Sequence, residues 1–185
     1  MPSYRMYGNL QLMLRHNVDL GMAGHLHYLA QAGVTFGQVP YPLLHLFSGN
    51  QTYTFDPYRF SMMNNYQYAA DKYLSLQANW NGGGVLFNQI PGLKYLRLRE
   101  LLEVKMAWGG LNDKHKSVID FPKLSHNTQT NYSLLTAPTV PYVELGVGIG
   151  NIFRLGELYS VWRLTHLKDA YTPYWSMRFR LFLGL

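Results

Sequence analysis

Charged side chains recur at alternate positions along the chain, in the pattern that places residues on one face of a β-sheet. The set comprises Arg5, Arg15, Glu103, Lys105, Glu144, Arg163, Arg178 and Arg180. Because neighbouring strands lie about 4.8 Å apart, these side chains can form a ladder of charges across the inner wall of a barrel. The simplest interpretation is a paired network that fills and stiffens the interior. The sharper alternative is an electropositive passage, since rings of arginine favour anions.

Catalytic chemistry has less support in the sequence. Glu103 and Glu144 acting as acid and base inside the barrel are the one enzymatic route that we find. The sequence contains no G-x-S-x-G, P-loop or H-E-x-x-H motif. Residues 146–150 alternate glycine with Val and Ile like part of a dinucleotide loop, but no helix pattern follows. Their glycines share one strand face and predict a smooth strip beside another side chain or strand. We therefore expect a protein that is not an enzyme.

His25 and His27 share one face of a predicted strand, two residues apart. Two histidines can ligate a metal, but no third ligand is recognisable by its spacing. A polar pair that lines the barrel interior is the simpler interpretation. The chain has no cysteine, so thiolate and disulfide chemistry are excluded. We expect neither a metal nor another cofactor.

The elements that must position these residues are β-strands. In residues 175–185 every odd position is apolar, while the even positions include Arg178 and Arg180. A similar alternation occurs in seven further segments, which are 4–15, 22–36, 60–69, 73–80, 100–109, 142–150 and 158–167. Their lengths suit the roughly 9–11 residues that span a bilayer at a tilt. The sequence therefore predicts an all-β fold, an antiparallel transmembrane β-barrel of about eight strands, with one domain over residues 1–185.

Aromatic residues support the membrane interpretation. Trp80, Trp108 and Trp175 each fall at the end of a predicted strand and on its apolar face, where an interfacial aromatic girdle would lie. Trp162 falls in the middle of a predicted strand and does not add to this set.

Composition narrows the class further. No apolar run approaches the roughly 18 residues that a membrane helix needs. Hydrophobic residues make up 48% of the chain, yet the mean hydropathy is only −0.14, so they are dispersed among polar ones. The net charge of +6 comes from cations spread singly, so we expect no nucleic-acid partner. No signal peptide is visible, which favours a C-terminal piece of a larger exported barrel.

Two long connections carry apolar residues, at 37–59 and 81–97. If the C-terminus is periplasmic, eight strands place both on the periplasmic side and place 110–141 and 166–174 outside the cell. Exposed apolar loops seldom stay uncovered, so we expect 37–59 and 81–97 to bind periplasmic or outer-membrane protein partners.

Alternation alone leaves open which face points inward. The alternative is a soluble eight-stranded barrel with an apolar ligand in its interior. That arrangement would line a cavity with Leu145, Val147 and Phe179, and would place Glu144, Arg178 and Arg180 in water.

Five stretches of sequence resemble a known family. They are Val39-Pro40-Tyr41-Pro42-Leu43-Leu44, 48–53, 87–94 with 98–100, 107–114, and 141–153. Together they resemble the C-terminal barrel of a Bacteroidota outer-membrane family, whose members carry an N-terminal carboxypeptidase-regulatory-like domain and an uncharacterised barrel. The resemblance implies an outer-membrane location, with lipid and lipopolysaccharide as surroundings. It implies no known activity. Barrels of this kind tend to end in an aromatic residue, whereas this chain ends in Leu185.

Overall fold

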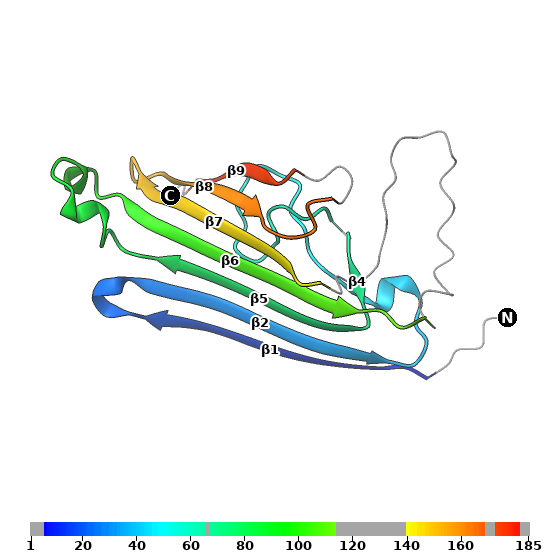
Figure 1. Ribbon diagram of the computed structural model, residues 1–185. Coiled ribbons are helices and arrows are strands. Elements are labelled where there is room, and N and C mark those ends of the chain that lie inside the picture. Colours follow the sequence, from blue (N-terminus) through cyan, green and yellow to red (C-terminus); the bar gives the residue numbers. More distant parts are fainter. Residues whose placement is uncertain (1–5, 66, 114–139, 169–172, 182–185) are drawn as a thin grey trace, which may run out of the picture.

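The computed structural model describes residues 6–65, 67–113, 140–168 and 173–181. Seven long strands form one antiparallel sheet in which each strand pairs with the next in the chain. They are β1 (Gly8–Asp19), β2 (His25–Phe36), β5 (Lys72–Asn81), β6 (Arg99–Gly110), β7 (Tyr142–Ile152), β8 (Gly156–Arg163) and β9 (Trp175–Leu181). A second sheet pairs β3 (His45–Leu46) with β4 (Ala69–Ala70). The predicted all-β antiparallel fold is confirmed (Figure 1).

Four short 3-10 turns lie in the described residues. They are η1 (Gly21–Ala23), η2 (Tyr41–Leu43), η3 (Phe87–Gln89) and η4 (Leu93–Leu96). None of the helices in this part of the chain is long and apolar enough to cross a membrane.

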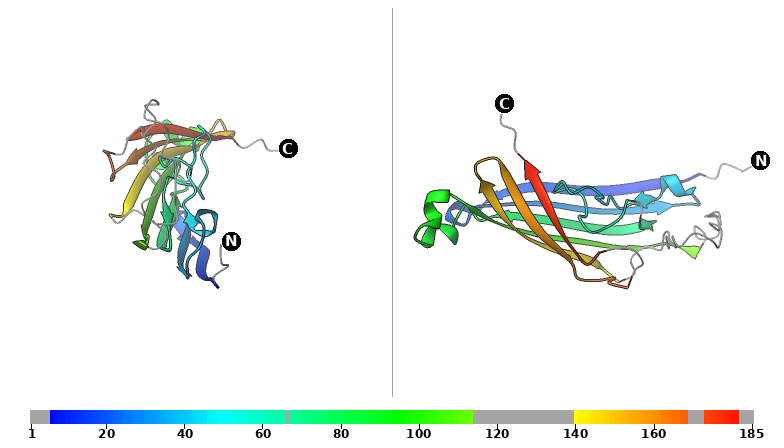
Figure 2. Two further views of the ribbon diagram at one scale, coloured as in Figure 1. Left: turned by 90° about the vertical axis from the view of Figure 1, so that its right-hand side faces the viewer. Right: turned by 90° about the horizontal axis from the view of Figure 1, so that it is seen from above.

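The seven-stranded sheet curves into a trough and stays open, because β1 and β9 do not pair in the described residues. Viewed along the strands, the chain between β2 and β5 lies on the concave side of this trough (Figure 2). We call residues 37–70 the inserted segment and the concave side of the sheet the inner face. The inserted segment also contacts β9, since the backbone N–H of Phe55 donates to the carbonyl of Phe179 over 2.6 Å.

The predicted strand over 60–69 is wrong. Phe60, Ser61, Met62 and Met63 are all buried, so this stretch has no exposed face to match its alternation. These residues belong to the inserted segment, and only the end of the stretch forms a strand, β4. The long sheet therefore contains seven strands where eight were expected.

Losing one strand changes which connections share an end of the sheet. Residues 37–71, 111–141 and 164–174 connect strands at one end, which we call the loop rim. The short connections 20–24 and 153–155 and the longer 82–98 lie at the opposite end, the turn rim. Segment 37–59 therefore starts from the loop rim and folds onto the inner face, whereas 81–97 lies at the turn rim (Figure 1), which corrects the expectation that they share one side.

The core lies between the inserted segment and the inner face. One cluster packs Phe47, Phe60 and Met63 of the segment against Tyr73 and Tyr142 of the sheet. A second packs Phe55 and Met62 against residues of β6 and β8, and the rings of Phe55 and Tyr159 stack with centroids 3.8 Å apart. The sheet thus buries the face that carries its charges, while its other face has no protein cover in the described residues.

Candidate functional site

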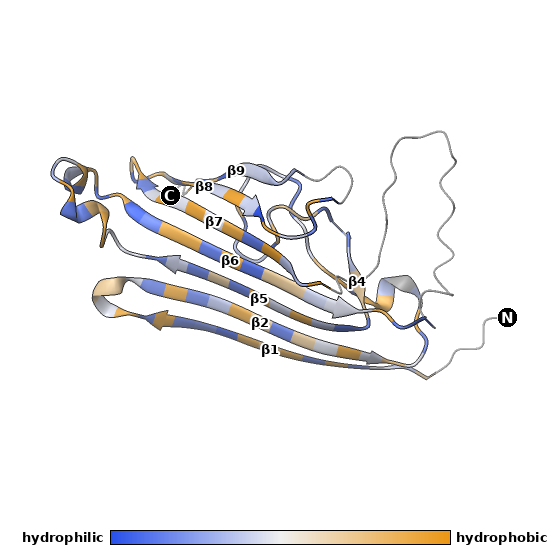
Figure 3. Cartoon of the chain, viewed as in Figure 1, coloured by the Kyte–Doolittle hydropathy of each residue, from blue (hydrophilic) through white to orange (hydrophobic). Residues whose placement is uncertain are grey.

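The two faces of the sheet have opposite polarity and opposite burial. On the outer face, Val147 and Phe179 are 47% and 43% exposed. On the inner face, Lys105 and Glu144 have no exposed surface. The alternation of hydrophobic and hydrophilic residues along each strand is visible in Figure 3. The soluble alternative required an enclosed Val147 and a solvated Glu144, and the described residues show the reverse.

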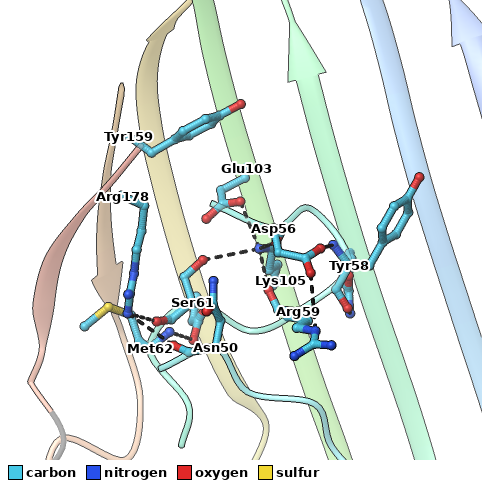
Figure 4. Close-up of polar contacts among 12 residues, drawn as sticks. Asn50, Asp56, Tyr58, Arg59, Ser61, Met62, Glu103, Lys105, Tyr159 and Arg178 are labelled. Atoms are coloured by element: carbon cyan, nitrogen blue, oxygen red, sulfur yellow. Dashed lines mark hydrogen bonds and ion pairs between the residues drawn. The ribbon is translucent and has the colours of Figure 1, made fainter. Parts of the chain in front are cut away.

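Lys105 holds the inserted segment to the middle of the inner face. Its ammonium group donates to the carbonyls of Asp56 at 3.1 Å and Arg59 at 2.7 Å, and to Oγ of Ser61 at 3.4 Å (Figure 4). It also lies 3.1 Å from Oε2 of Glu103. The Glu103 oxygens accept no well-aligned hydrogen bond in the described residues, so this ion pair is what offsets the burial of the carboxylate.

Glu144 binds the backbone of the inserted segment at Ser61 and Met62. Its Oε2 accepts the backbone N–H of Ser61 at 2.8 Å, and its Oε1 accepts the N–H of Met62 at 2.6 Å. The hydroxyl of Tyr142 also donates to Oε1, at 2.5 Å. Both carboxylate oxygens are therefore occupied, and they satisfy two backbone donors that have no strand partner.

Two arginines of the sheet also bind the inserted segment. The guanidinium of Arg178 donates to the carbonyls of Asn50, Thr52 and Ser61, all in the inserted segment. Arg163 donates to the hydroxyl of Tyr68 at 3.2 Å, also in the inserted segment. Charge-assisted hydrogen bonds of this kind are among the stronger ones in proteins.

The structure therefore brings the predicted charged residues together, but few of them pair with one another. Lys105, Glu144 and Arg163 are direct cross-strand neighbours, as the ladder required. Most of their hydrogen bonds go to the inserted segment. One direct ion pair joins Lys105 with Glu103, and another joins Arg180 with Glu157, which is not in the predicted set. The inner wall is thus a clamp for backbone groups of one segment.

Arg5 and Arg15 are the two N-terminal members of the predicted set. Arg15 donates a hydrogen bond to the hydroxyl of Tyr58 in the inserted segment, and its guanidinium lies 4.5 Å from that ring's centroid. Arg5 lies outside the described residues.

Sequence reasoning missed Glu157, whose Oε2 lies 2.6 Å from the guanidinium of Arg180. These two residues are cross-strand partners between β8 and β9. Glu157 lies one residue before the predicted strand 158–167, so that prediction does not place it on the same face as Tyr159. Starting that strand two residues earlier would have placed it on the inner face.

The tryptophans are divided between the two rims. Trp108 and Trp175 lie near the loop rim, and both are 47% exposed. Trp162 joins them as the cross-strand partner of Trp175, because β8 ends at Arg163 and the predicted mid-strand position was wrong. Trp80 lies at the turn rim, where its indole N–H donates to the carbonyl of Ala23 at 2.8 Å.

A cavity of about 480 Å³ opens on the inner face between the inserted segment and the turn rim. The cross-strand neighbours Asn17, His27 and Asn79 line it, and a ring nitrogen of His27 contacts Oδ1 of Asn17. His25 lies beside Asp19, with Nδ1 and Oδ1 3.6 Å apart. In the part of the chain that the structure describes, no group of three His, Cys, Asp or Glu side chains is arranged to hold a metal ion.

The predicted smooth strip in residues 146–150 is confirmed. A Cβ atom at Gly146 would lie 2.3 Å from Cγ of Glu103, and one at Gly148 would lie 2.9 Å from Cδ1 of Tyr159. Both distances are shorter than real Cβ contacts, so the inner face has no room for a side chain at these positions.

Replacing Gly146 with alanine is expected to destabilise the fold by about 1–3 kcal/mol, because the new methyl group overlaps Glu103. Glu103 cannot retreat without stretching its ion pair with Lys105. The midpoint of thermal unfolding of the purified protein measures the effect. Gly110→Ala is the matched control, since a Cβ there meets no atom within 4 Å. Equal midpoints for the two variants would contradict the prediction.

The fold and its inner wall define an all-β protein whose charged sheet face is buried under an inserted segment and whose apolar face is exposed. Residues 3–119, more than half of the chain, match the C-terminal domain of DUF5686, a family of unknown function. The chain belongs to this family. Neither a curated protein nor a solved structure matches it. The predicted membership of an uncharacterised family is confirmed, while the regulatory-like N-terminal domain and the Bacteroidota origin stay predictions.

Proposed function

We propose that this chain forms part of the wall of an outer-membrane β-barrel with a structural, transport or membrane-biogenesis role. The observation that carries the proposal is the inverted sheet, with its apolar face exposed and its charged face buried. A water-soluble sheet protein places its apolar face in the core. A barrel in lipid has the opposite pattern, with apolar residues outward and polar residues toward the interior.

The exposed apolar surface is continuous across neighbouring strands. It includes the outward-facing residues Leu74, Leu102, Val104, Trp108, Val147, Ile149, Leu158, Trp162, Met177 and Phe179, each at least 36% exposed. Soluble monomers rarely expose apolar patches larger than a few hundred Å². Surrounding lipid, including lipopolysaccharide, would cover this face.

The free edge of the sheet supports a larger barrel. β1 is a twelve-residue strand whose residues are almost all exposed, and in the described residues only β2 pairs with it. A long, apolar edge strand is a template for pairing and aggregation unless it is covered. Further strands of the same barrel, hydrogen-bonded to β1, would cover it.

The two rims support an orientation. Outer-membrane barrels have longer extracellular loops and shorter periplasmic turns. The loop rim carries the two longest connections, 37–71 and 111–141, and the turn rim carries the two shortest, 20–24 and 153–155. We infer that the loop rim faces outside and the turn rim faces the periplasm, where the C-terminal strand β9 ends.

The inner wall supports a narrowed or closed interior. Lys105, Glu144 and Arg178 each bind backbone groups of the inserted segment. An electropositive passage along this wall would require that segment to move. These contacts also favour a structural role for Glu144 over acid–base catalysis, since both its oxygens already accept hydrogen bonds.

The proposal predicts that the intact protein is recovered in the outer-membrane fraction and migrates faster on a gel before boiling than after it. A folded barrel resists detergent until heated, and its compactness alters its mobility. Recovery in the soluble fraction, with mobility unchanged by boiling, would overturn the proposal. Planar-bilayer conductance then separates a transport role from a structural one.

A further inference from the structure

Two connections of the turn rim together form a basic pocket. The pocket has a volume of about 570 Å³ and lies between the 82–98 connection, the start of β6 and the β7–β8 turn. Its polar side chains are Lys94, Arg97, Arg99, Arg154, Asn88 and Asn151. Its cations thus come from positions more than fifty residues apart in the sequence.

The charge of this pocket is unbalanced. None of its four cations forms an ion pair in the described residues, and no acidic side chain lines it. Like charges that converge in this way raise the local positive potential and attract an anion. Arginine is especially suited to phosphate, which its planar guanidinium can bind through two parallel hydrogen bonds.

The backbone around the pocket is held in a costly conformation. Arg97, Asn151 and Arg154 have φ values of 52°, 61° and 63°, in the left-handed region that disfavours residues other than glycine. Such a conformation, least unfavourable for Asn151, persists where the surrounding structure enforces it. One contact that holds this conformation joins the two connections: Nδ2 of Asn151 donates to the carbonyl of Arg97 at 2.7 Å.

A buried carboxylate fixes the 82–98 connection. Glu100 accepts the backbone N–H groups of Gly84 at 2.9 Å, Leu86 at 2.6 Å and Phe87 at 2.5 Å. The connection is therefore anchored to β6 beside the pocket, and the cationic side chains extend from a fixed backbone.

The same two connections expose large apolar side chains. Tyr95 and Leu96 are exposed on η4, and Phe153 and Leu155 are exposed in the β7–β8 turn. Basic and aromatic residues together are typical of the level at which lipid headgroups meet water. A free phosphate ion would use the cations but would leave these apolar groups uncovered.

We propose that this pocket binds the phosphate of an anionic lipid headgroup, with the neighbouring apolar side chains against the lipid chains. The inference rests on the proposed function, because it requires the turn rim to lie at a membrane surface. It assigns a lipid ligand to 82–98, where the sequence predicted a protein partner.

The test uses the intact protein folded in an uncharged maltoside detergent. Phosphatidylglycerol, phosphatidylcholine with the same acyl chains, and inorganic phosphate are the three probes, and native mass spectrometry measures bound lipid. The variant Arg97→Gln/Arg154→Gln is expected to weaken phosphatidylglycerol binding roughly tenfold or more, since each basic residue near an anionic surface contributes about 1 kcal/mol. Lys94→Gln is a milder second variant that leaves both left-handed positions unchanged.

The control variant Lys72→Gln/Lys168→Gln removes the same charge at the loop rim and is expected to bind as the unmodified protein does. Equal binding of the two lipids, equal losses in variant and control, or strong binding of inorganic phosphate with no lipid preference would each overturn the inference. Heat-modifiable mobility is scored on every sample. A protein that keeps this property without a lipid preference refutes the lipid site alone, whereas its loss in the unmodified protein refutes the barrel.

Discussion

Replacing Glu144 with leucine is expected to release the inserted segment from the inner face. The change leaves the N–H groups of Ser61 and Met62 and the hydroxyl of Tyr142 without their acceptor. A buried donor without a partner costs about 1–3 kcal/mol, so the three together cost roughly 3 kcal/mol or more. Glu144→Gln keeps one oxygen acceptor, but its amide NH₂ faces a group that is itself a donor. We therefore expect a loss of stability smaller than that of Glu144→Leu.

Cysteine labelling measures this release directly, because the chain contains no cysteine of its own. Met62 contributes only its backbone to the Glu144 contact, and its side chain is buried in the second core cluster. Met62→Cys therefore reports on the segment with little change to the clamp. Its reaction with a maleimide is expected to be slow in the parent protein and much faster with Glu144→Leu.

The matched control is Glu100→Leu, which removes another buried carboxylate that accepts three hydrogen bonds. That carboxylate anchors 82–98 at the turn rim. We expect this variant to make 82–98 sensitive to limited proteolysis while the cysteine at position 62 stays protected. Equal labelling in the two variants would indicate a general loss of stability and would contradict a clamp specific to Glu144.

The different fates of the predicted strands have one physical explanation. Alternation identified the seven long strands. Its physical basis is clearest in β6, whose two faces meet different surroundings, so that buried Glu103 and Lys105 alternate with exposed Leu102 and Val104. Residues 60–69 show a weaker alternation, but Phe60, Ser61, Met62 and Met63 are buried in succession, so the pattern there carries no information about a face.

The candidate site was predictable in its residues but not in its role. Alternation placed Lys105, Glu144 and Arg163 on one face of consecutive strands, and the register makes them direct cross-strand neighbours. Their partners are largely backbone N–H and carbonyl groups, which every residue possesses and no sequence pattern marks. The basic pocket was missed for a related reason, since Arg154 joins Arg97 only through the path of two connections.

Replacing Lys105 with methionine is expected to cost roughly 3–5 kcal/mol, because it leaves the carboxylate of Glu103 buried and unpaired. The carbonyls of Asp56 and Arg59 lose their shared donor as well. The midpoint of thermal unfolding in detergent measures the loss. Lys72→Met removes an exposed lysine from the start of β5 and serves as the control, with little change expected.

The double variant Glu103→Gln/Lys105→Met separates the two causes. If the buried charge dominates, neutralising Glu103 restores much of the lost stability, because the cost of an unpaired carboxylate disappears. The remaining deficit then measures the unsatisfied carbonyls of the inserted segment, and Met62→Cys labelling in this background shows whether that segment is still held. A double variant as unstable as Lys105→Met alone would mean that the carbonyl contacts, and not the ion pair, are the main contribution of Lys105.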